Sequence, residues 1–123
     1  MIGDGQLLET FVFQELRRQA SGSPEILAFY HFRNRDDDEV DVVIECGPLL
    51  AGIEVKASGT VRSEDFRGLR KLQEISGERF ACGVLLYDGE ASVRFGPRLV
   101  ALPVQTLWGG AGENDEDRVG LVC

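Results

Sequence analysis

The sequence predicts a single α/β domain in which a helix, three strands, a second helix and a fourth strand follow one another. Two segments carry apolar residues at helical spacing, and short runs rich in β-branched and aromatic residues lie between and after them. The 123 residues, 43% of them hydrophobic, suffice for one core. We expect one domain over residues 1–108 and an acidic, flexible tail over residues 109–123.

Both expected helices have recognisable boundaries. The first covers residues 5–20, where no Pro or internal Gly interrupts the apolar positions Leu8, Val12 and Leu16. The second begins with Ser63 as a cap, carries acidic residues in its first turn and stops at Gly77. We expect its apolar stripe to lie in the core; the stripe consists of Phe66, Leu69, Leu72 and Ile75.

The expected strands are short and mostly apolar. Residues 40–44 and 50–55 flank a Gly-Pro turn and are close enough to form a hairpin. Residues 80–87 form a nearly continuous apolar run, which is typical of a strand buried on both faces. The remaining strands are expected at residues 26–32, 92–95 and 99–102.

Charge and cysteine content restrict the function. A formal net charge of −8 argues against a surface that attracts nucleic acid everywhere, although residues 56–79 carry a local basic excess. That excess fits a basic flank of a site and a solvated helix face equally well. The three cysteines match neither a zinc knuckle nor a disulfide framework, so we expect thiols. No signal pattern or membrane-length apolar run occurs, which predicts a cytoplasmic protein without membrane contact.

Three charged residues stand out inside apolar strands. Strand alternation places Glu54 and Lys56 on one face of their strand, and Asp41 interrupts the apolar run VDVVI. Burial of such groups is costly without a partner, a metal or solvent. A hairpin could bring Asp41 and Glu54 to one ion, and two carboxylates with a carbonyl suit Mg²⁺. An ordinary ion pair between Lys56 and either carboxylate explains the same spacing and stays open.

A resemblance to known families rests on several blocks. Asp41 followed by GIEVKAS at 52–58 is similar to the signature of the PD-(D/E)xK, or restriction-endonuclease-like, superfamily. The blocks GQLLETFVFQEL, EVDVVIE and DFRGLRKL, with LVALPVQTLW up to Trp108, resemble an uncharacterised domain found C-terminal to an AAA+ ATPase in many prokaryotic proteins. The resemblance implies a restriction-endonuclease-like α-β-β-β-α-β core, with a mixed central sheet flanked by helices.

The resemblance also implies roles for individual residues. Asp41, Glu54 and the carbonyl of Val55 would bind Mg²⁺ or Mn²⁺, Lys56 would be the base that positions the attacking water, and Glu9 would be a helix acid near the metal. Glu15 is expected at the surface, paired with Arg18. Gln73 and His31 are expected to have no site role, the first as a solvated side chain and the second as a satisfied, half-buried one.

Two functions remain open at this point. One is a Mg²⁺-dependent nuclease that hydrolyses DNA phosphodiesters. The other is a catalytically inactive module of the same fold that serves an interaction or regulatory role. Both are compatible with an AAA+ ATPase partner in cis or in trans and with a homodimer. Because the sequence starts almost at the first helix, we expect a freestanding copy or a domain separated from its ATPase.

Overall fold

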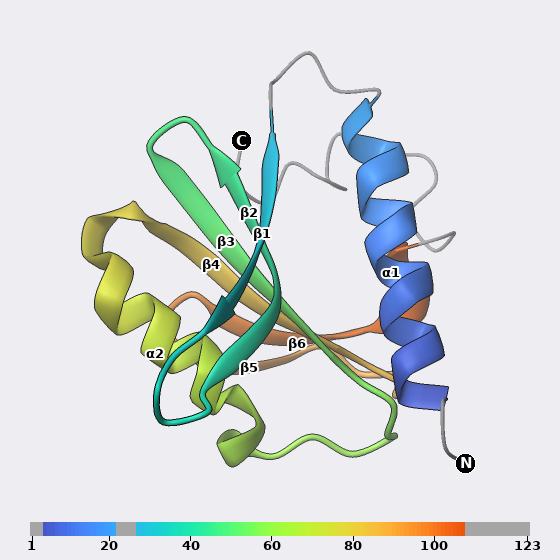
Figure 1. The fold of residues 1–123 in the computed structure, drawn as a ribbon. Coiled ribbons are helices and arrows are strands. Elements are labelled where there is room, and N and C mark those ends of the chain that lie inside the picture. Colours follow the sequence, from blue (N-terminus) through green and yellow to red (C-terminus); the bar gives the residue numbers. More distant parts are fainter. Residues whose placement is uncertain (1–3, 22–26, 108–123) are drawn as a thin grey trace.

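The computed structural model describes residues 4–21 and 27–107, without the side chains of residues 4–11 and 20. One six-stranded sheet lies between helices α1 (Asp4–Ser21) and α2 (Arg67–Ser76), which pack on opposite faces (Figure 1). The strands are β1 (Ala28–Arg33), β2 (Glu39–Cys46), β3 (Leu49–Lys56), β4 (Phe80–Tyr87), β5 (Val93–Gly96) and β6 (Leu99–Pro103). Short 3-10 turns, η1 (Ser63–Phe66), η2 (Gly77–Arg79) and η3 (Val104–Leu107), complete the described part.

The sheet is mixed, with strand order β1-β2-β3-β4-β6-β5. Strands β1, β2 and β3 are antiparallel neighbours, whereas β4 pairs in parallel with both β3 and β6. A parallel pair needs a crossover connection, and α2 provides it between β3 and β4. The α/β fold and the expected order of elements are therefore confirmed.

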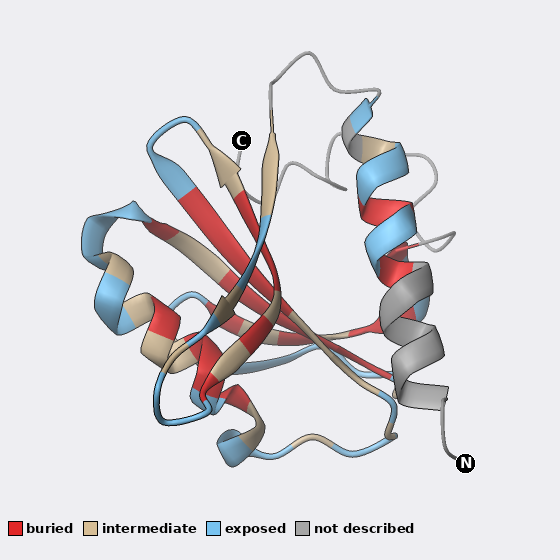
Figure 2. Cartoon of the chain, in the orientation of Figure 1, coloured by how far each residue is buried: buried red, intermediate tan, exposed pale blue. Residues whose placement is uncertain are grey.

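Each face of the sheet has its own core. On the α1 face, Val12 and Leu16 pack against residues such as Ile53 and Val84. On the α2 face, Leu69 and Leu72 pack against a second set, which includes Val40, Val43, Phe80 and Leu85. Buried positions run along the central strands in Figure 2, in keeping with burial of the sheet on both faces. The central strands are therefore packed on both faces.

A β-bulge interrupts the start of β2. Along β1 the register advances by two residues, from Tyr30 to Phe32, while along β2 it advances by three, from Val43 to Val40. The extra residue places Val40 and Val43 in the same core, although a regular strand would direct them to opposite faces. Asp41 lies between these two valines, so its setting differs from that in the regular strand predicted from the sequence.

Helix α2 is seated directly on the start of β2. A Cβ atom at Gly68 would lie 2.0 Å from the carbonyl oxygen of Glu39, so only glycine allows this approach of the two backbones. At Gly52 a Cβ atom would lie 2.7 Å from Leu69 and 2.8 Å from Leu72, which shows that this part of β3 faces α2. The beginnings of β2 and α2 and the middle of β3 therefore pack together.

Several local expectations were wrong or lie outside the described residues. Ile75 is 60% exposed, so the end of the expected apolar stripe lies outside the core. Ser63 begins η1, and α2 starts at Arg67. Cys46 is disulfide-bonded, which spacing along the chain cannot reveal. The expected tail, residues 109–123, falls in the part that is not described, and none of the described helices is long and apolar enough to cross a membrane.

Candidate functional site

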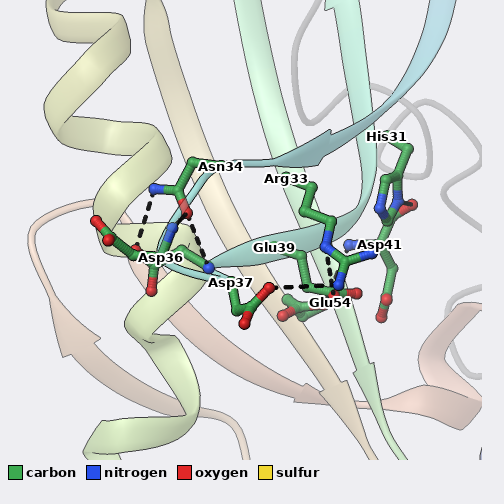
Figure 3. Close-up of polar contacts among 9 residues, drawn as sticks. His31, Arg33, Asn34, Asp36, Asp37, Glu39, Asp41 and Glu54 are labelled. Atoms are coloured by element: carbon green, nitrogen blue, oxygen red, sulfur yellow. Dashed lines mark hydrogen bonds and ion pairs between the residues drawn. The ribbon is translucent and has the colours of Figure 1, made fainter.

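Asp41 and Glu54 meet at the bulge through reciprocal hydrogen bonds. The backbone N–H of Asp41 donates to Oε1 of Glu54 at 3.1 Å, and the backbone N–H of Val55 donates to Oδ2 of Asp41 at 2.8 Å. Figure 3 shows the two carboxylates next to each other. Each side chain thus accepts a backbone N–H group of the neighbouring strand through one carboxylate oxygen, just past the Val42–Ile53 pair that ends the β2–β3 register.

The environment of Glu54 opposes a negative charge. Burial, hydrogen bonding to Asp41 and the negative charge of Asp41 raise the pKa of Glu54 to about 9, and Glu39 adds to the effect. Two carboxylates that share a site cannot both ionise without a counter-charge. The pair therefore either holds a proton or requires a cation.

Lys56 does not supply that cation. Its Nζ donates to Oδ2 of Asp65 at 2.6 Å, and no ion pair joins it to Asp41 or Glu54, all four residues being among those described. Asp65 belongs to η1, on the face of the sheet that α2 covers. Strand alternation places Lys56 on the same face as Gly52 and Glu54, as predicted. Asp41 and Glu54 therefore meet as the hairpin allows, while Lys56 pairs with Asp65 and with neither carboxylate.

The turn before β2 is held by a separate polar network. Asn34 Oδ1 accepts the backbone N–H groups of Asp36 and Asp38, both at 3.0 Å, which is a common way for Asn to fix a turn. The buried carboxylate of Asp38 accepts from Asn34 Nδ2 at 3.1 Å and from Arg67 Nε at 2.5 Å. The hydrogen bond from Asn34 and the charge of Arg67 lower the pKa of Asp38 although burial opposes them. This network fixes the approach of the chain to Asp41.

An open cavity of about 670 Å³ lies beside this turn and not at the carboxylate pair. Its basic side chains are already engaged: Lys71 pairs with Glu74 at 3.0 Å, and Arg70 donates to the carbonyl oxygens of Ser63 and Phe95. These contacts favour a solvated helix face over a basic flank for this segment. The lining residues are Asp36, Asp38, Arg67, Arg70, Lys71 and Glu74.

Three other residues singled out in the sequence lie in helices: Glu9 and Glu15 in α1, and Gln73 in α2. Glu9 lies in α1, but its side chain is not described, so its role stays a prediction. Glu15 pairs with Arg18 as expected, yet it is buried and not at the surface, because Gln19 bridges it to the carbonyl oxygen of Leu107. Gln73 donates to the carbonyl oxygen of Pro97, which gives it a structural contact.

His31 is exposed, not half-buried as expected, because β1 is an edge strand. Its Nδ1 lies 3.5 Å from the carbonyl oxygen of Asp41, and Figure 3 shows it beside that residue. Sequence reasoning also missed Asp65 as the partner of Lys56. The available signal was its position three residues after Arg62, whose backbone N–H it accepts at 2.7 Å in the manner of a capping residue.

The donor set at the bulge fits a hard divalent cation. Two carboxylates and the neighbouring carbonyl of Val55 would be the protein ligands, and Mg²⁺ commonly uses few protein ligands and keeps several waters. A cation would also relieve the repulsion that raises the pKa of Glu54. No cluster of three or more His, Cys, Asp or Glu side chains suited to a metal occurs among the described residues, so the fit depends on these two carboxylates.

Comparison with known proteins identifies the family but not a function. No curated protein matches the chain. A solved structure described as a half-complex from a tetradecameric assembly of Thermococcus gammatolerans McrB AAA+ hexamers with bound McrC contains a chain of similar fold. The TM-score is 0.55 at 15% identity, over 94% of this chain and 32% of that chain, so the similarity concerns the fold. A family model matches residues 4–107, and the chain belongs to the family described as Domain of unknown function (DUF4143).

Proposed function

We propose that the domain is a PD-(D/E)xK-type phosphodiesterase that acts on DNA with Mg²⁺ or Mn²⁺ bound by Asp41, Glu54 and the Val55 carbonyl. The observation that carries the proposal is the meeting of Asp41 and Glu54, neither of which forms an ion pair with a described side chain. Structural carboxylates in this protein, such as Asp38 and Asp65, have a basic partner. The unbalanced pair is therefore the place where a bound cation would be most favourable.

Each residue has a defined task in this proposal. The bound cation would supply positive charge to the phosphate oxygens of the substrate. Asp41 and Glu54 would hold it at the edge of the β2–β3 hairpin, with their second oxygens held in place by the hydrogen bonds to the backbone. Lys56 would place a further positive charge near the phosphate, where charge develops during hydrolysis. Glu9 remains the fourth proposed residue, on α1.

A second candidate function is a catalytically inactive module that regulates or binds a partner. It is favoured by the fact that the carboxylates already complete backbone hydrogen bonds and that Lys56 has its own partner, Asp65. In both cases we propose an AAA+ ATPase as a functional partner, since the similar chain of known structure comes from an assembly of McrB AAA+ hexamers with McrC. This chain spans about a third of that chain's length, so the partnership is part of the proposal.

The test is a titration of Mg²⁺ and Mn²⁺ against labelled linear, branched and single-stranded DNA, using wild type, Asp41→Asn and Lys56→Ala. We expect Asp41→Asn to lose metal binding, and Lys56→Ala to keep it while turnover falls by a factor on the order of 10² to 10³, as for loss of one charge-stabilising group. A wild type that binds Mn²⁺ with DNA present but cleaves none of the substrates would favour the inactive module. Absence of Mn²⁺ binding would refute the metal site.

A further inference from the structure

The partner of Lys56 is itself firmly held. The side chains of Lys56 and Asp65 are 30% and 22% exposed, so the ion pair is screened less by solvent than a surface pair. Asp65 Oδ2 accepts from the ammonium at 2.6 Å and from the backbone N–H of Arg62 at 2.7 Å. Burial raises the pKa of Asp65, but these hydrogen bonds outweigh it and the net change is downward. Asp65 is thus a carboxylate fixed in its charged form.

The connection between the two residues is also anchored. The backbone N–H of Ser58 donates to the carbonyl oxygen of Lys56, and the N–H of Asp88 donates to that of Ser58, both at 2.9 Å. Thr60 donates its N–H to the Ser58 hydroxyl at 3.2 Å. The segment that leaves β3 and leads to η1 is therefore tied to the end of β4, and Asp65 is presented to Lys56 by a defined backbone path.

Without Asp65, Lys56 would still have Glu54 of the carboxylate pair on its own face of β3. Glu54 and Lys56 are two residues apart on the same face of β3, which separates their Cα atoms by about 7 Å. The lysine stem is long and flexible, and its ammonium can pair with any carboxylate within its reach. An ammonium at Asp41 and Glu54 would neutralise the charge that a divalent cation needs.

We propose that Asp65 is a positioning residue that holds the Lys56 ammonium away from Asp41 and Glu54 and so keeps this pair available to a divalent cation. The inference rests on the proposed function, because it assumes that the pair binds a metal. It assigns Lys56 a fixed position: its ammonium is bonded to the Asp65 carboxylate at 2.6 Å and acts from there as a positive charge. This differs from the role of base that the family resemblance implies.

The test is a double-mutant cycle on Mn²⁺ affinity with wild type, Asp65→Asn, Lys56→Met and Asp65→Asn/Lys56→Met. Asn keeps an oxygen to accept the Arg62 N–H but removes the charge. We expect Asp65→Asn to weaken Mn²⁺ binding by roughly tenfold, within the usual range for residues that orient metal ligands. If Asp65 acts through Lys56, the same substitution changes affinity little in the Lys56→Met background. Asp65→Glu should restore most of the affinity.

Lys56 and Lys71 are the two lysines of the sequence, which allows a direct view of the ammonium groups. With ¹⁵N-labelled lysine, the Lys56 signal should shift in Asp65→Asn while the Lys71 signal stays in place and reports a folded protein. Glu74→Gln, which removes the partner of Lys71, is the matched control and should leave Mn²⁺ affinity unchanged.

Three results would overturn the inference. If Asp65→Asn has no effect on Mn²⁺ affinity, or an equal effect in both backgrounds, Asp65 does not act through Lys56, and the proposed metal site stands without it. If the Lys56 signal does not shift in Asp65→Asn, the ion pair is not what holds the ammonium. If wild type binds no Mn²⁺ with DNA present, the proposed function itself fails, and the inference falls with it.

Discussion

Two clusters of partly buried charge lie at the start of β2, and they differ in charge balance. In the turn cluster, the buried Asp38 is matched by Arg67 and by the side chain of Asn34. In the carboxylate pair, Asp41 and Glu54 face each other and receive backbone N–H groups but form no ion pair with a described side chain. A charge that is balanced inside the protein mainly supports the fold, whereas an unbalanced pair needs something from outside. The carboxylate pair, and not the turn cluster, is therefore the candidate for a bound ligand.

The largest effect is expected at Gly68, which lies against the backbone of Glu39, between Asp38 of the turn cluster and Asp41 of the pair. Ala at this position would place its Cβ 2.0 Å from the carbonyl oxygen of Glu39, and neither backbone can yield easily. We expect Gly68→Ala to destabilise the protein by about 2 to 4 kcal/mol, despite the better helix propensity of Ala. Chemical denaturation measures this change. A neutral or stabilising result would mean that α2 is not seated on β2 and that the clusters are independent.

The carboxylate pair should show its imbalance as a dependence of stability on pH. The pKa of Glu54 is about 9 in the folded state and about 4.5 when unfolded, so between these values the folded state holds a proton that the unfolded state has lost. Stability of the metal-free protein should therefore fall as pH rises from about 4.5 to 9. Glu54→Gln removes this dependence and should stabilise the protein at pH 8 by on the order of 1 to 3 kcal/mol.

Thermal melting in the presence of a chelator, at pH 4 and at pH 8, measures the effect of Glu54→Gln. The two proteins should melt alike at pH 4 and differ at pH 8. Added Mn²⁺ should reverse the order by stabilising wild type but not the variant. Parallel melting curves for wild type and Glu54→Gln at all pH values would show that the pair is already balanced.

The order of elements could be predicted from the sequence because it depends on local patterns. The apolar stripe of Leu69 and Leu72 and the continuous run in β4 determine what each segment buries, and the structure agrees with both. Strand alternation also correctly placed Glu54 and Lys56 on one face. The bulge at Asp41 could not be foreseen, since it depends on the register between β1 and β2. The pairing of Lys56 with Asp65 and of Asp38 with Arg67 depends on how η1 and α2 dock, which spacing along the chain does not determine.

The smallest effect is expected in the turn cluster, and it tests whether balance alone distinguishes the two clusters. Arg67 is 71% exposed, so Arg67→Ala removes a partner that is largely in solvent, while Asn34 still donates to Asp38. We expect the melting temperature at pH 7 to fall by roughly 3 to 6 °C, a minor change for a domain of this size.

Because the pKa of Asp38 is lowered in the folded state, this stabilisation is present above the carboxyl's ordinary pKa of 3.8 and is lost as pH falls through the folded-state value. The difference between Arg67→Ala and wild type should therefore shrink in acid. Glu74→Ala, on the same helix and in an exposed pair with Lys71, is the matched control and should leave the melting temperature almost unchanged. If Arg67→Ala instead created a Mn²⁺ site at Asp38, loss of balance would by itself suffice to bind a cation; if it creates none, the second carboxylate at the bulge is also required.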